Sequence, residues 1–264
     1  SSLEVLVGVY AYAIKIYADF SGYSDVAIGS AKLFGYELPR NFDAPYTSAD
    51  LQEFWRRWHI SLSTWLRDYL YVTLGGNRGG TWKTYRNLLL TMVLGGLWHG
   101  ASWNFVIWGA LHGGALACSR AWQRRHHSPR PIQPLGASSV SGGEEVPREQ
   151  QVLTPMRVLA VIATFHFVCF AWIFFRAPTF AHAVLMLTRM AKLSFAAPNL
   201  TVRILAILAL GFATHFIPRG LYHRIEGIFV RSPALLQGIA LAVCAYVLHF
   251  AAGAKAEPFI YGQF

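Results

Sequence analysis

The chain has 264 residues, of which 54% are hydrophobic and 14% charged, and its formal net charge is +10. A mean hydropathy of +0.35 indicates an integral membrane protein and excludes an ordinary soluble domain. The basic residues lie mostly between apolar runs, which indicates contact with lipid headgroups and argues against nucleic-acid binding. Because the sequence begins at Ser1 without a recognisable secretory signal, we expect it to be part of a longer protein.

The first elements are expected to form a broken membrane helix. Residues 3–17 are apolar apart from two charged positions and predict a helix, whereas the polar stretch 17–25 contains a glycine and predicts a break. Residues 26–34 return to a helical pattern. Since irregular backbone at membrane depth is tolerated where it lines a cavity, Asp19 is a candidate for polar support of a site.

An amphipathic helix is expected after the proline-containing loop 38–46. Thr47 and Asp50 have the spacing of a capping box, so the helix is predicted to begin there. Apolar side chains then recur at helical spacing and define one face of a helix lying at the membrane interface, with His59 at the border of that face. These side chains are Leu51, Trp55, Trp58, Leu62 and Trp65.

The run 88–119 contains no Asp, Glu, Lys or Arg over 32 residues (119 − 88 + 1) and is long enough to cross a membrane. It holds His99, and an ionisable group at that depth is costly and usually functional. Glycines interrupt the run, so two alternatives remain. One is a single tilted span, and the other is a helix ending near His99 followed by a second helix from Trp103.

The rest of the chain is divided by a polar segment. Residues 123–155 are rich in Pro, Ser, Gly, Arg and Glu and predict a mobile loop. Three further spans are expected at 158–175, 202–216 and 234–250, with an amphipathic piece at 181–193. We therefore expect a core portion at 1–122, the loop 123–155, and further transmembrane helices of the same domain at 156–264.

Two histidines are the candidate catalytic residues. An apolar setting favours the neutral imidazole that a general base requires, so His99 is expected to take a proton from an alcohol. His59 would orient the acceptor or stabilise an oxyanion, with Asn104 as weaker polar support. Trp98 and Trp103 would shape an apolar tunnel beside His99. The alternative is that each histidine only packs against a neighbouring helix, as we expect for His112, His166, His215 and His249.

Other site chemistries are weakly supported. Arg56 could hold an anionic carrier, although contact with lipid headgroups is the alternative, and we prefer that alternative for Arg57. The cysteines, which lie far apart in apolar runs, suggest neither a disulfide framework nor a metal site. The glycine-rich loop 74–80 lacks the ending of a phosphate-binding loop, and the sequence has no nucleophile-elbow serine motif. No bound cofactor is expected.

Four motifs together resemble the membrane-bound O-acyltransferase (MBOAT) family, and within it the bacterial branch that takes part in alginate O-acetylation. They occur in the expected order as YADFSGYSD at 17–25, FWRRWHISLS at 54–63, LGGNR at 74–78 and LWHGASWN at 97–104. The resemblance implies an all-α, polytopic membrane protein with broken and interfacial helices around a central tunnel. It also implies that His99 matches the family's invariant histidine and His59 its second active-site histidine, in a family whose chains are usually longer.

The resemblance implies acyl transfer from a donor such as acetyl-CoA or another acyl thioester to a hydroxyl group. In the polysaccharide branch the acetyl group is relayed across the bacterial inner membrane to periplasmic acetyltransferase partner proteins, which modify an exported polysaccharide. Transfer of D-alanyl or another acyl group to a cell-wall polymer is an alternative, and a non-catalytic transporter or scaffold is another. A transporter is typically built from inverted repeats, and the sequence shows none.

Overall fold

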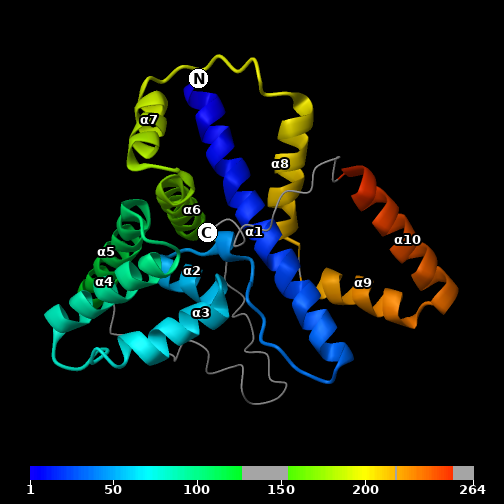
Figure 1. The fold of residues 1–264 in the computed structure, drawn as a ribbon, viewed down its shortest axis with the longest axis horizontal. Coiled ribbons are helices and arrows are strands. Elements are labelled where there is room, and N and C mark those ends of the chain that lie inside the picture. Colours follow the sequence, from blue (N-terminus) through cyan, green and yellow to red (C-terminus); the bar gives the residue numbers. More distant parts are fainter. Residues whose placement is uncertain (127–153, 218, 252–264) are drawn as a thin grey trace. The chain divides into compact units, whose positions relative to one another are not determined.

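The computed structural model describes residues 1–126, 154–217 and 219–251 (Figure 1). Within these ranges every regular element is helical, and no strand occurs. The chain divides into two compact units, Ser1–Leu208 and Ala209–Phe264, which are described separately below. Most of the expected loop 123–155 lies outside the described residues.

The first helix, α1, spans Ser2–Leu33 without a break. The Ser1 side chain accepts a hydrogen bond from the Glu4 N–H, and the Glu4 side chain returns to Ser1, so that a capping box begins the helix. The expected break at 17–25 is wrong. No atom lies within 4 Å of where a side chain on Gly22 would begin, so this glycine marks neither a turn nor a close contact.

The expected amphipathic helix is divided in two, which corrects the sequence-based prediction. A short 3-10 turn at Pro45–Thr47 precedes α2 (Leu51–Arg57), and α3 (Ile60–Trp65) follows after a two-residue break. The cap of α2 is Asp50, whose carboxylate accepts the Glu53 N–H, and the predicted box between Thr47 and Asp50 does not form. A π-helical turn, Leu66–Tyr71, continues from α3.

Two long helices cover the charge-free run. Helix α4 (Thr81–Trp98) and helix α5 (Trp103–His126) flank a short break at 99–102, so the two-helix alternative is the right one. They pack against each other (Figure 1) through glycines. A side chain on Gly96 would meet the Phe105 carbonyl oxygen at 2.2 Å, and one on Gly109 would meet the Met92 oxygen at 2.3 Å. The pairing of early α5 with late α4 makes the helices antiparallel, with small residues at the contact.

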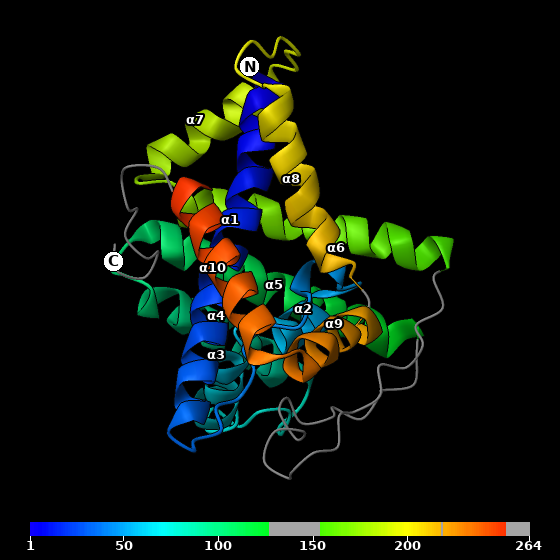
Figure 2. The same cartoon turned by 90° about the vertical axis from the view of Figure 1, so that its right-hand side faces the viewer.

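Helix α6 (Pro155–Arg176) crosses α1 and is followed by α7 (Phe180–Ala191) (Figure 2). Among the described helices, α6 is long and apolar enough to span a membrane by itself. A second candidate exists only if α8 and α9 are taken together as one bent span. The C-terminal end of α6 is buried and supplies much of the core, including Trp172, Phe174 and Phe175.

The remaining helices are α8 (Val202–His215), α9 (Arg219–Arg231) and α10 (Ala234–Ala251). The division between the two compact units falls within α8. Spans were predicted at the positions of α6, α8 and α10, and an amphipathic piece at that of α7. A helix occurs at each of these positions, and of the three described helices predicted as spans only α6 is long and apolar enough to cross a membrane by itself. Helix α9 was not predicted, because its alternation of charged and apolar residues lowers its mean hydropathy below that of a span.

Candidate active site

His99 lies where α4 ends. It is the C-terminal cap of the helix, and its N–H donates to the Gly96 carbonyl oxygen. Gly100 follows with φ +155, a backbone conformation that L side chains rarely adopt, and allows the chain to turn toward α5. A side chain on Gly100 would also meet the Phe105 ring at 2.8 Å. The glycine therefore fixes both the turn and the close contact beside the histidine.

The His99 imidazole is enclosed by aromatic rings and is 8% exposed. The ring centroids of Trp98 and Phe175 both lie 4.9 Å from it, and those of Trp108 and Phe105 lie at 5.4 and 6.0 Å. Such surroundings favour the neutral imidazole over the imidazolium, because a charge loses its hydration on burial. A neutral ring nitrogen can accept a proton, as general-base chemistry requires.

His59 occupies the break between α2 and α3. Its φ of +42 and ψ of +58 place it in the left-handed region, which few non-glycine residues adopt. Asn41 supports this turn, because its carbonyl oxygen accepts the Ile60 N–H and its side chain accepts the Ser61 N–H. The Phe20 ring of α1 lies against the imidazole at a centroid distance of 4.6 Å.

The two candidate histidines converge on one side chain. The Trp98 ring lies 4.9 Å from the His99 ring and 6.4 Å from the His59 ring. Trp98 is 56% exposed, whereas the other rings against His99, those of Phe105, Trp108 and Phe175, are buried. The structure thus brings His59 close to Trp98 and His99, although the two histidines lie forty positions apart in the sequence (99 − 59).

Asn104 is buried at the start of α5. Its side-chain nitrogen donates to the Ala177 carbonyl oxygen at 2.6 Å, which ties α5 to the end of α6. Its side-chain oxygen accepts no hydrogen bond from a described residue. Trp103, one position earlier, is 76% exposed and has no ring contact with either histidine in the described part of the chain. The expectation that Trp103 and Trp98 shape a tunnel therefore stays a prediction.

The remaining predicted site residues lie farther from this cluster. Arg56 is exposed on α2, and no hydrogen bond or ion pair joins it to another residue of 1–126, 154–217 or 219–251. Asp19 is half-buried on α1, beside Phe20, and its carboxylate likewise has no described hydrogen-bonding partner. No hydrogen bond or ion pair joins Arg56 or Asp19 to His99 or His59 in the described part of the chain.

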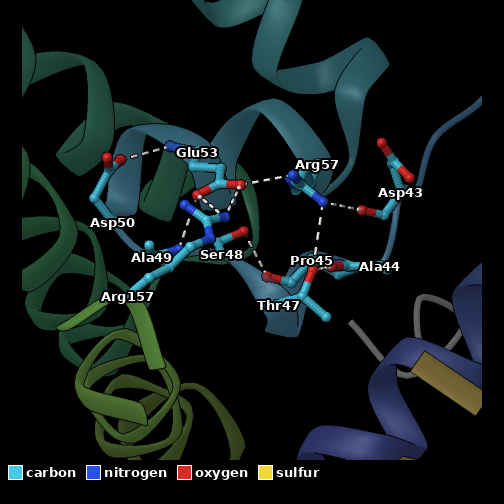
Figure 3. A network of polar contacts seen from close by, with 10 residues as sticks. All are labelled: Asp43, Ala44, Pro45, Thr47, Ser48, Ala49, Asp50, Glu53, Arg57 and Arg157. Carbon is cyan, nitrogen blue, oxygen red and sulfur yellow. Dashed lines mark hydrogen bonds and ion pairs between the residues drawn. The ribbon is translucent and has the colours of Figure 1, made fainter. Parts of the chain in front are cut away.

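A polar network holds α2 in place (Figure 3). The Glu53 carboxylate accepts hydrogen bonds from Arg57 at 2.6 Å, from the Ala49 N–H at 2.8 Å, and from Arg157 of α6 at 3.1 Å. Arg57 also donates to the Thr47 hydroxyl. The expectation that Arg57 contacts lipid headgroups is therefore wrong, because its guanidinium serves this internal network.

The Glu53 carboxylate stays ionised despite its burial. Burial by itself would raise the pKa of Glu53, but the Ala49 N–H, Arg57 and Arg157 together lower that pKa below its ordinary value of 4.5. The network fastens the first turn of α6 to α2. It thereby fixes α2, the helix that leads into His59.

The four histidines expected to be packing residues differ in burial. His112 and His215 are buried. His166 is exposed and hydrogen-bonded to the Tyr10 hydroxyl at 2.7 Å, and His249 is exposed on α10, so neither of these two packs in a core. No group of three metal-ligating side chains occurs among the described residues.

Several residues around the histidines were not found by sequence analysis. Phe20, Trp108 and Phe175 contact the two imidazoles from three different helices. In a chain with 18 Phe and nine Trp, helical spacing marks such residues only as core-facing. Their closeness to a histidine depends on how α1, α5 and α6 pack.

The chain was compared with known proteins. The model of the MBOAT, membrane-bound O-acyltransferase family matches residues 5–135. The chain is 60% identical over 132 residues to a protein of Azotobacter vinelandii named "Probable alginate O-acetylase AlgI", an overlap covering 50% of this chain and 26% of that relative. It is 42% identical over 194 residues to a peptidoglycan O-acetyltransferase of Helicobacter pylori, covering 74% of this chain and 33% of the relative.

A more distant relative is a teichoic acid D-alanyltransferase of Streptococcus thermophilus, 36% identical over 133 residues, covering 47% of this chain and 32% of the relative. The chain thus spans between a quarter and a third of the length of these relatives. All four sequence motifs, both candidate histidines and the α4–α5 pair lie inside the matched range 5–135. The chain belongs to the membrane-bound O-acyltransferase family, a family of acyltransferases.

Proposed function

We propose that the protein transfers an acyl group to a hydroxyl group, with His99 as the general base. The observation that carries this proposal is the convergence of His99 and His59 on the accessible ring of Trp98. A buried neutral imidazole beside an accessible face is suited to deprotonating an acceptor hydroxyl that approaches from that face. The family and the names of its relatives support the same class of reaction.

The reaction needs one base and one donor of a hydrogen bond. His99 takes the proton from the acceptor hydroxyl as its oxygen attacks the carbonyl carbon of an acyl thioester. The tetrahedral intermediate then collapses, the carbon–sulfur bond breaks, and the proton on His99 passes to the departing thiolate. His59 donates a hydrogen bond to the oxyanion or orients the acceptor.

The other proposed site residues bind substrate. The exposed Trp98 lies beside His99, and Asn104 offers a buried amide oxygen near the end of α6. Trp103 and Arg56 are exposed and would meet a substrate or anionic carrier arriving from outside the core. Asp19 would supply polar support from α1.

The proposed setting is the bacterial inner membrane, where the protein is a multi-pass helical bundle around a central tunnel. The donor is acetyl-CoA or another acyl thioester, and no cofactor stays bound. The acetyl group is relayed through periplasmic acetyltransferase partners to an exported polysaccharide such as alginate, in line with the name of the Azotobacter vinelandii relative. The relative named for D-alanyl transfer to teichoic acid supports the alternative of another acyl group and a cell-wall polymer.

The test compares polymer O-acetylation in cells that carry the complete gene as wild type, His99→Ala or His59→Ala, at matched amounts of protein in the membrane. We expect acetyl ester to disappear with His99→Ala and to fall strongly with His59→Ala. His249→Ala is the matched control, since this histidine is exposed on α10. Normal acetylation by His99→Ala would overturn the proposed chemistry and favour the transporter or scaffold alternative.

A further inference from the structure

The inner side of His99 is closed by three buried aromatic rings, Phe105 and Trp108 of α5 and Phe175 of α6. Phe175 is 4% exposed, and its ring meets the imidazole at a centroid distance of 4.9 Å and an interplanar angle of 76°. Trp108 is 2% exposed and stands nearly perpendicular to the imidazole at 88°. We call these three rings the inner wall.

The inner wall is held from several directions. Phe175 packs against Phe105 at 5.1 Å, against Trp108 at 5.3 Å and against Trp172 at 5.1 Å. Two residues after Phe175, the Ala177 carbonyl oxygen accepts the Asn104 hydrogen bond that ties α6 to α5. Because interiors packed in this way do not yield to an added group without strain, the wall is a fixed boundary.

A fourth ring, that of the 56% exposed Trp98, also lies 4.9 Å from the imidazole. If His99 deprotonates the acceptor hydroxyl, the acyl carbonyl carbon lies within about 3 to 3.5 Å of the attacking oxygen, and that oxygen lies in hydrogen-bond reach of the imidazole. The acyl tail therefore begins a few ångströms from the imidazole. It has to fit among the rings that surround the imidazole, of which the inner wall is buried and Trp98 is exposed.

We propose that the inner wall limits the transferred acyl group to the size of acetyl, and that Phe175 is the specificity-determining residue. This inference rests on the proposed function, because it assumes that the acyl carbonyl reacts beside His99. Phe175 is singled out for two reasons. It is the closest ring of the wall, and it comes from α6, so its truncation changes no residue of the α4–α5 turn.

The chain offers a matched control in the adjacent residue. Phe174 is also a buried phenylalanine of α6, at 7% exposure, but its ring contacts Phe170 and Phe180. Phe174→Ala and Phe175→Ala thus remove the same ring from neighbouring positions of one helix. Phe175 differs from Phe174 in its ring contacts with His99 and with the aromatic rings packed around His99.

The experiment measures transfer from acetyl-CoA, butanoyl-CoA and hexanoyl-CoA in membranes from cells expressing the complete gene. We expect the wild type and Phe174→Ala to use acetyl alone. Phe175→Ala should gain about tenfold or more in the ratio of longer-chain to acetyl transfer, the discrimination typical of a methylene in an apolar pocket. Should Phe175→Ala not accumulate, Phe175→Leu makes a smaller opening and is expected to admit butanoyl but not hexanoyl.

The outcomes separate the two proposals. Acetyl transfer by the wild type with unchanged selectivity in both Phe175 variants would overturn the inference and leave the proposed function standing. An equal gain in Phe174→Ala, or efficient hexanoyl transfer by the wild type, would overturn it as well. A wild type that transfers none of the three groups, and that matches His99→Ala, would overturn the proposed function and the inference together.

Discussion

The side-chain oxygen of Asn41 accepts two hydrogen bonds from Ser61, one from its N–H at 3.2 Å and one from its hydroxyl at 2.7 Å. An oxygen in this position caps the first turn of α3, as a capping side chain of the helix itself would do. Because α3 begins directly after His59, Asn41 holds the turn on which the histidine stands. Asn41 is therefore a positioning residue in the site that we propose.

Replacing Asn41 by alanine is expected to lower the free energy of unfolding by roughly 0.5 to 2 kcal/mol, the usual cost of losing a helix cap. It should also lower kcat for acyl transfer while changing KM little, since the turn at His59 loses its support. Asn41→Asp keeps an accepting oxygen and should restore most of both quantities. A variant Asn41→Ala with wild-type kcat would contradict the positioning role.

The left-handed backbone at His59 predicts a difference in stability between two variants that both lose activity. In this region a residue with a Cβ costs roughly 1 kcal/mol or more relative to glycine. His59→Gly should therefore be more stable than His59→Ala by about 1 kcal/mol, although both variants lose the imidazole and should lose most of the activity. The midpoints of thermal unfolding in detergent provide the comparison. Equal midpoints would show that the turn is not strained.

The antiparallel packing of α4 and α5 depends on glycines at particular positions. Gly109→Ala is expected to cost roughly 1 to 3 kcal/mol, since its new Cβ would overlap the Met92 carbonyl and push the helices apart. Gly114 of the same helix has no atom within 4 Å of a new Cβ. Gly114→Ala should therefore be neutral, or stabilising by up to about 1 kcal/mol. Similar losses in both variants would argue against close packing at Gly109.

The Glu53 network predicts a dependence of stability on pH. Since the folded protein lowers the pKa of Glu53 below 4.5, the carboxylate contributes stability that is fully present above pH 4.5. This contribution is lost as the pH falls from 4.5 through the lower pKa of the folded state. Glu53→Gln should be less stable than wild type at neutral pH, by roughly 1 to 3 kcal/mol, and the difference should shrink in acid. The exposed Glu37, changed to glutamine, is the control, and an equal pH response of both variants would contradict the network's role.

His112 is buried at 1% exposure, and neither ring nitrogen has a hydrogen-bonding partner among the described residues. Its ring packs among aromatic side chains, with Trp108 at 4.9 Å and Trp55 at 5.2 Å. Phenylalanine fits these surroundings without burying polar atoms, so His112→Phe should leave stability unchanged or raise it by about 1 kcal/mol. Acyl transfer should persist. Loss of transfer in a folded His112→Phe protein would show that this histidine does more than pack.

The sequence predicted the end of α4 at His99 correctly as one of two alternatives, because glycines beside a buried histidine indicate a turn. It did not predict the break at His59. Apolar side chains keep their helical spacing across that break, so periodicity cannot reveal a single residue in the left-handed conformation. It also predicted a break in α1 that does not occur, since Gly22 is tolerated inside the helix.

The inner wall and the Glu53 network could not be predicted in the same way. Phe175 contacts His99, and Arg157 contacts Glu53, only because α6 packs on α2 and α5. The spacing of residues in a single sequence does not indicate such pairs, because their members lie far apart along the chain. What the sequence did provide is the choice of His59 and His99 as candidates. Their chemistry is unusual in an apolar run, whereas a phenylalanine there is ordinary.

Two neighbouring residues of α2 contact α5 and α6, the helices that precede and follow residues 127–153. Gln52 donates a hydrogen bond to Gln123 near the end of α5, and Glu53 pairs with Arg157 in the first turn of α6. Helices α5 and α6 are thus each joined to α2 through side chains of the described residues. Proteolytic cleavage within residues 127–153, or insertion of additional sequence there, should leave the surroundings of His99 unchanged.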